Sequence, residues 1–139
     1  MSTLSIGWTQ ADAHRSLTRF RRLLAVNLVL QSLVALLCIL APSWGAWITG
    51  IEPSLARPLL PVWGGLVLLV SALQVLAWLD PVRQRFQVAI ALAGRVLMAL
   101  IYLCLGWQFW RFAVFDAGFA LALGLLFHRA LIAEIQTRP

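Results

Sequence analysis

Charged residues are scarce in this sequence. They make up 12% of its 139 residues, whereas 62% are hydrophobic, and the mean hydropathy is +0.89. A water-soluble domain is roughly a quarter charged and half apolar, so this composition excludes a water-soluble globule. Four membrane spans of about 20 residues each would leave only short tails and connections. We therefore predict one all-α integral membrane domain over residues 1–139.

Lysine is absent from the chain. All 11 basic residues are arginine, and with 5 acidic residues they give a net charge of +6. A strongly basic balance can indicate a nucleic-acid partner. Here the arginines flank apolar runs and do not gather on one basic face, so we interpret them as markers of membrane topology. We expect no nucleic-acid partner.

Histidine and cysteine are also rare, which limits the available chemistry. His14 lies in the basic N-terminal stretch and His128 at an expected helix end, so they cannot supply the paired axial ligands of a transmembrane haem. Cys38 and Cys104 have apolar neighbours and predict two buried structural thiols at similar depth, with a disulfide or redox pair as the alternative. No metal-ligand spacing, phosphate loop or nucleophile motif occurs. We therefore expect no metal, no cofactor and no catalysis by this chain alone.

Long apolar runs are abundant, and they predict four spans at about residues 23–41, 59–79, 87–110 and 112–132. Pro58 and Pro61 are expected to open the second span. Asp80 and the proline after it are expected to close that span, because proline and its preceding residue disfavour a continuing helix. The short link that follows makes the third span antiparallel to the second. The predicted fold is an antiparallel four-helix membrane bundle.

The arginine distribution predicts the orientation of the spans. With the N-terminus inside, eight arginines lie on inner segments and two on outer ones. The inner ones are Arg15, Arg19, Arg21, Arg22, Arg83, Arg85, Arg129 and Arg138, and the outer ones are Arg57 and Arg111. Because cytoplasmic flanks retain positive charge, we expect both termini in the cytoplasm, in a bacterial inner membrane.

The stretch from Thr9 to the first span predicts a short interfacial helix. Leu17, Phe20 and Leu24 would share one face of this helix, while arginines occupy another. Such a helix is typical of segments that lie in the headgroup layer.

Tryptophan gathers on the expected outer side. Trp44 and Trp47 lie three residues apart in the longest connection, residues 42–58, and Trp107 and Trp110 lie at the second outer turn. One interpretation is anchorage in the headgroup layer. The other is docking against a partner protein, because tryptophan is favoured at the centres of interfaces.

Polar residues within the spans are the main candidates for a functional site, since each needs a partner where water is absent. Asn27 and Gln31 share one helix face, and Ser71 and Gln74 share another. Arg95 falls at about the same depth, so the five are expected to form one polar layer, where a guanidinium can bind an anionic headgroup, a carboxylate or a quinone oxygen. Two alternatives stay open. The uncharged residues would only hold helices together, and Arg95 would extend to the membrane surface.

Asp116 is the only acidic residue expected near the hydrocarbon. It either caps the fourth span or is buried near the outer face. A hairpin that turns near Arg111 would place Asp116 about 16 Å from the level of Arg95, so we expect these two residues not to pair. Arg95 would instead lie near Gly124, Phe127 and His128.

The lack of catalytic motifs and of soluble mass favours a non-catalytic accessory subunit that packs against a larger membrane enzyme or transport complex, with a lipid or quinone as its candidate ligand. Small residues at helical spacing, at Ala89 and Ala93 and again at Ala120 and Gly124, would allow close packing. The main alternative is a small homo-oligomeric carrier that binds an amphipathic or anionic substrate near Arg95. A third is an enzyme acting on lipids, with Asp116 or His128 as acid or base.

Overall fold

The computed structural model describes residues 10–137, and this part of the chain consists of helices and short connections, without a strand. Four helices are long and apolar enough to cross a membrane: α1 (Gln10–Leu40), α3 (Pro53–Leu79), α4 (Arg85–Leu105) and α5 (Trp110–Thr137). A short helix, α2 (Pro42–Thr49), joins α1 to α3, and a 3-10 turn, η1 (Trp107–Phe109), joins α4 to α5. The prediction of an all-α chain with four such helices is confirmed.

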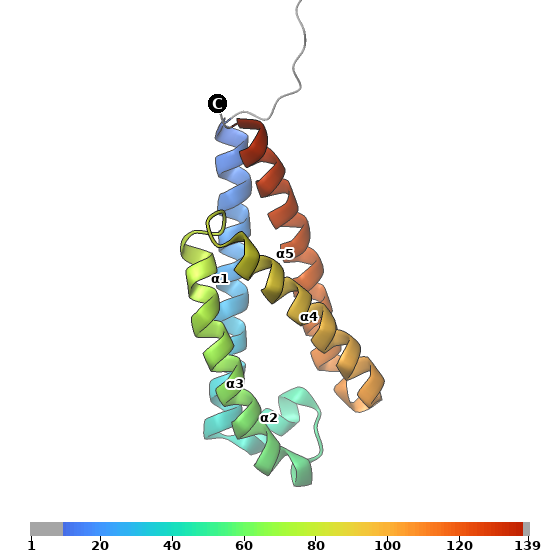
Figure 1. Ribbon diagram of the computed structural model, residues 1–139. Helices are drawn as coiled ribbons and strands as arrows, with labels where there is room; N and C mark the ends of the chain where they lie inside the picture. Colours follow the sequence, from blue (N-terminus) through green and yellow to red (C-terminus); the bar gives the residue numbers. More distant parts are fainter. Residues whose placement is uncertain (1–9, 138–139) are drawn as a thin grey trace, which may run out of the picture.

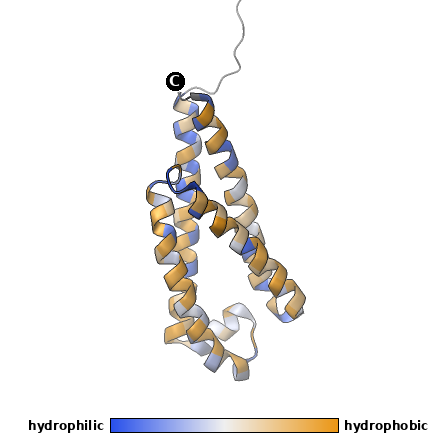
Figure 2. Ribbon diagram, viewed as in Figure 1, coloured by the Kyte–Doolittle hydropathy of each residue, from blue (hydrophilic) through white to orange (hydrophobic). Residues whose placement is uncertain are grey.

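The four long helices form two packed pairs. Figure 1 shows α3 alongside α1, and α4 alongside α5, while few contacts join α3 to α4. The pairs meet mainly where α1 contacts α5. These two helices project beyond the connection between α3 and α4, so their free ends lie side by side (Figure 1). Hydrophilic residues gather at that end and at the α3–α4 connection, and apolar residues dominate elsewhere (Figure 2).

Two apolar clusters fill the interior. The first surrounds Phe20 of α1 and Phe127 of α5, whose ring centroids lie 5.2 Å apart. The second surrounds Cys38 of α1 and Leu60 of α3, near α2. Along α1 and α3 the buried residues between these clusters include four polar ones, Asn27, Gln31, Ser71 and Gln74.

A close approach of α1 and α3 depends on Gly64. A Cβ atom at this position would lie 2.6 Å from the carbonyl oxygen of Ala35 and 2.9 Å from Cγ1 of Ile39. The adjacent Gly65 faces open space, with nothing within 4 Å of such an atom. The two helices therefore touch at a position that only glycine can occupy without displacement of the backbone.

The predicted separate interfacial helix is wrong. α1 runs unbroken from Gln10 through the expected boundary at Leu23, because neither proline nor glycine interrupts it. Phe20 and Leu24 are buried in the first cluster instead of resting on a membrane surface. Thr9 lies outside the described residues.

The expected start of the second span is also wrong. α3 begins at Pro53, so Pro58 and Pro61 lie inside the helix and do not open it. Each proline removes one helical hydrogen bond and frees the carbonyl four residues earlier. Those carbonyls belong to Ser54 and Arg57, which are exposed at the helix end, where the loss is tolerated.

The turn between the last two spans comes earlier than predicted. α4 ends at Leu105 because Gly106 has a φ of 115°, a backbone conformation that residues other than glycine rarely adopt. α5 then starts at Trp110 and continues to Thr137. The connection is therefore centred on residues 106–109, ahead of the expected turn at Arg111.

Arg111 joins the two connections at the end of the molecule opposite the termini. Its Nη1 donates to the carbonyl oxygens of Trp47, at 2.9 Å, and Ile48, at 2.8 Å. These carbonyls belong to the last turn of α2, where a cation is favourable because the helix dipole is negative. Gly50 ends the helix with a φ of 78° and leaves room for the guanidinium.

Candidate functional site

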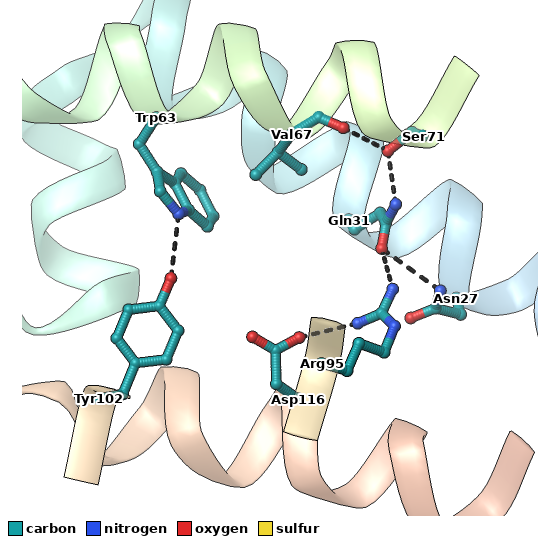
Figure 3. Close-up of polar contacts among 8 residues, drawn as sticks. All are labelled: Asn27, Gln31, Trp63, Val67, Ser71, Arg95, Tyr102 and Asp116. Atoms are coloured by element: carbon teal, nitrogen blue, oxygen red, sulfur yellow. Dashed lines mark hydrogen bonds and ion pairs between the residues drawn. The ribbon is translucent and has the colours of Figure 1, made fainter. Parts of the chain in front are cut away.

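Hydrogen bonds and an ion pair connect a group of polar side chains from the four long helices (Figure 3). We call it the polar centre, and it consists of Asn27, Gln31, Ser71, Arg95 and Asp116. All four long helices contribute, two residues coming from α1 and one each from α3, α4 and α5. The structure thus brings together four of the five residues expected in one layer and adds Asp116.

Arg95 is the charged core of the polar centre. It lies midway along α4, about 15 Å from either end at 1.5 Å per residue, and is 8% exposed. Its Nη1 donates to Oδ1 of Asp116 at 2.8 Å, and its Nη2 donates to Oε1 of Gln31. The Arg95 side chain therefore points between the helices, and the alternative in which it extends to the membrane surface is wrong.

Asp116 forms the ion pair that the sequence analysis rejected. It is the seventh residue of α5, so it is not the cap of that helix either. The pair was rejected because the turn was expected at the wrong residue. When a hairpin turn moves by a few residues, the residue of the second helix that lies opposite Arg95 moves by twice as many. A turn centred on 106–109 places Ala120 opposite Arg95, about 6 Å along the helix from Asp116. A long arginine side chain covers that distance, whereas the predicted neighbour His128 is exposed and has no part in the polar centre.

Gln31 links the two helix pairs. Its Oε1 accepts from Asn27 Nδ2 at 3.3 Å as well as from Arg95. Its Nε2 donates to Ser71 Oγ at 2.5 Å, and that hydroxyl donates to the carbonyl oxygen of Val67 at 2.7 Å. One amide therefore connects α1 to α3 on one side and to α4 on the other. The expected shared face of Asn27 and Gln31 is the basis of this link.

Two buried polar groups remain without a partner in the described part of the chain. Asn27 is fully buried, and its Oδ1 accepts no hydrogen bond there. Gln74 is 6% exposed, and its side chain forms no hydrogen bond with the described residues. It lines a cavity of about 10 Å³ beside Arg95, which is room for a single water molecule at most.

An aromatic contact joins α3 to α4 on the other side of the ion pair. Trp63 Nε1 donates to the hydroxyl of Tyr102 at 3.2 Å (Figure 3). The ring of Phe112 lies 5.1 Å from each of these two rings. This group was not predicted from the sequence. Tyr102 is the only tyrosine in the chain, but its spacing from Trp63 carries no periodic signal.

The four tryptophans considered for partner docking are all exposed at the end opposite the termini. Trp44 is 64% exposed, Trp47 is 74% exposed, and Trp107 and Trp110 stack on each other with centroids 6.0 Å apart. Exposure of these rings fits both anchorage and docking. Cys38 is buried as expected, whereas Cys104 is exposed, because it lies on the outward face of α4.

The hydrogen bonds and the ion pair of the polar centre join all four long helices. Both charges are compensated within the chain, and the adjacent cavity is too small for an organic ligand. Among residues 10–137, no group of histidine, cysteine and acidic residues is placed to hold a metal ion.

The chain matches no protein-family model, and no curated protein or solved structure matches it either.

Proposed function

We propose that this protein is a small, non-catalytic subunit of a bacterial inner membrane, which packs against a larger membrane enzyme or transport complex. The polar centre supports a scaffolding role because its donors and acceptors are used almost entirely inside the chain. What distinguishes a subunit from an isolated bundle is a surface suited to another helix. Exposed small residues on α4 support the presence of such a surface.

The outward face of α4 carries small residues. A helix face that contacts only lipid does not require small residues. Ala89, Ala93 and Gly94 are exposed, and a Cβ atom on Gly94 would meet nothing within 4 Å. Small residues in membrane helices allow backbones of neighbouring helices to approach closely, as Gly64 does inside this chain. This exposed small-residue face is the observation that carries the proposal.

A larger side chain on this face is expected to prevent the partner from binding. In Ala93→Leu, co-purification of a stoichiometric partner in mild detergent should fall at least about tenfold, because the added side chain holds the helices apart. Quantitative mass spectrometry of the tagged chain, isolated from its native membrane, measures this loss. Ala72→Leu is the matched control, since Ala72 is an exposed alanine on α3 and the same change there should have no effect.

The Trp44→Ala/Trp47→Ala variant extends the same assay to the exposed rings of α2. Loss of the partner with normal membrane insertion would assign them to docking, and retention would leave them as anchors. Recovery of homo-oligomers alone, insensitive to Ala93→Leu, would contradict the subunit proposal. It would favour the carrier, in which separation of Arg95 from Asp116 exposes the guanidinium to an anionic substrate.

The orientation that we propose has both termini in the cytoplasm, because eight arginines oppose two across short connections. A fluorescent reporter that folds only in the cytoplasm should be active when fused after residue 139. Alkaline phosphatase, which is active only outside, should be inactive there and active when fused after Gly50. The reverse pattern would contradict this topology.

A further inference from the structure

The free ends of α1 and α5 enclose a basic groove. Its volume is about 140 Å³, against about 10 Å³ for the cavity beside Arg95. We call it the end groove, and it is lined by Asp12, Arg15, Ser16, Arg19, Leu126 and Arg129. Arginines from both helices line it: Arg15 and Arg19 come from α1, and Arg129 comes from α5. At this end of the molecule α1 and α5 project beyond the α3–α4 connection (Figure 1).

The charge of the end groove is only partly neutralised. Arg15 pairs with Asp12 at 3.0 Å, and both side chains are well exposed. The guanidinium groups of Arg19 and Arg129 form no ion pair or hydrogen bond with any residue in the described range 10–137. Within residues 10–137, two of the arginines that line the groove, Arg19 and Arg129, therefore have no counter-charge.

The position of the end groove matches the headgroup layer. Phe20 and Phe127 belong to the first apolar cluster, and each is next in the chain to residues at the groove. Phe20 directly follows Arg19, and Phe127 lies two residues before Arg129. At the end of α3, Trp78 lies under Arg21, with 5.2 Å from the guanidinium carbon to the ring centroid. Tryptophan paired with arginine at the end of an apolar helix is typical of the membrane–water interface. The end groove thus borders the first apolar cluster.

We propose that the end groove binds the phosphate group of an anionic glycerophospholipid from the adjoining leaflet. Guanidinium groups suit a phosphate because each offers a planar fork of N–H donors that matches two phosphate oxygens. Basic pockets between membrane helices are favourable sites for such headgroups. Leu126 supplies an apolar contact for the glycerol region. The proposal rests on the membrane placement of the helices but not on any protein partner.

The test uses the full chain, purified alone and reconstituted in nanodiscs that contain phosphatidylglycerol and phosphatidylcholine in equal amounts. Lipids that remain bound after gentle release are counted by native mass spectrometry. The unmodified chain should retain phosphatidylglycerol preferentially. Arg19→Gln/Arg129→Gln should lower its retention at least about tenfold, because each arginine near a headgroup contributes appreciably to binding.

The matched control is Arg83→Gln/Arg85→Gln, which removes two charges at the α3–α4 connection, away from the end groove. It should keep the preference for phosphatidylglycerol, and circular dichroism should show the same helicity for both double variants. An equal loss in both would reduce the effect to net charge and overturn the proposal, as would absence of a preference in the unmodified chain. Displacement of the lipid by millimolar glycerol 3-phosphate would overturn it in favour of a soluble phosphate compound.

Discussion

Replacing Arg95 with leucine is expected to lower the free energy of unfolding by about 3–5 kcal/mol, because it leaves the buried Asp116 without its counter-charge. The substitution removes the 2.8 Å ion pair between Arg95 on α4 and Asp116 on α5. It also removes the hydrogen bond that the second guanidinium nitrogen of Arg95 donates to Gln31. Unfolding of the protein in mild detergent, monitored by the far-ultraviolet circular dichroism of its helices, measures the change in the free energy of unfolding.

The double variant Arg95→Met/Asp116→Leu separates the loss of an interaction from the burial of an unpaired charge. It should recover most of the stability, since an ion pair replaced by apolar residues of similar volume is often neutral. A double variant as unstable as Arg95→Leu would show that the polar centre depends on more than charge compensation. Unchanged stability of Arg95→Leu would contradict the role of the ion pair altogether.

Gly64→Ala is expected to destabilise the chain by about 1–3 kcal/mol, although it adds a single methyl group. The methyl would lie 2.6 Å from the Ala35 carbonyl oxygen, so either α1 or α3 must move. Gly64→Leu enlarges the clash and should prevent the two helices from packing. The same detergent unfolding measurement, with size-exclusion chromatography to detect aggregation, reports both effects.

Gly65→Ala provides the control within the same helix turn. Nothing lies within 4 Å of a Cβ atom at Gly65, and alanine favours a helix more than glycine does, so stability should be unchanged or slightly higher. Equal destabilisation by the two alanine substitutions would mean that helix flexibility, and not the α1–α3 contact, explains the effect.

The presence of four long helices could be predicted because the length of an uncharged apolar run is a property of the sequence alone. The residues at which these helices begin and end could not be predicted in this way. The proline rule placed the start of the second span at Leu59, yet α3 tolerates Pro58 and Pro61 near its exposed end. Likewise, α1 has no internal break, so the boundary expected at Leu23 corresponds only to a change from basic to apolar residues.

The polar centre was partly predictable for a similar reason. Spacing along one helix places Asn27 and Gln31 on the same face, and this holds whatever the rest of the chain does. The partner of Arg95 depends on where the next turn lies, and Gly106 turns the chain several residues before Arg111. Contacts such as that of Trp63 with Tyr102 join residues 39 positions apart, which helical periodicity does not relate.

The ion pair between α4 and α5 has a consequence for synthesis of the protein. An arginine near the middle of an isolated membrane helix costs about 2.5–3.5 kcal/mol to insert. Asp116 follows Arg95 by 21 residues, so its charge becomes available only after the first turns of α5 have left the ribosome. We therefore expect α4 and α5 to enter the bilayer together as a hairpin. α1 and α3 carry only uncharged polar residues at their centres and can insert one at a time.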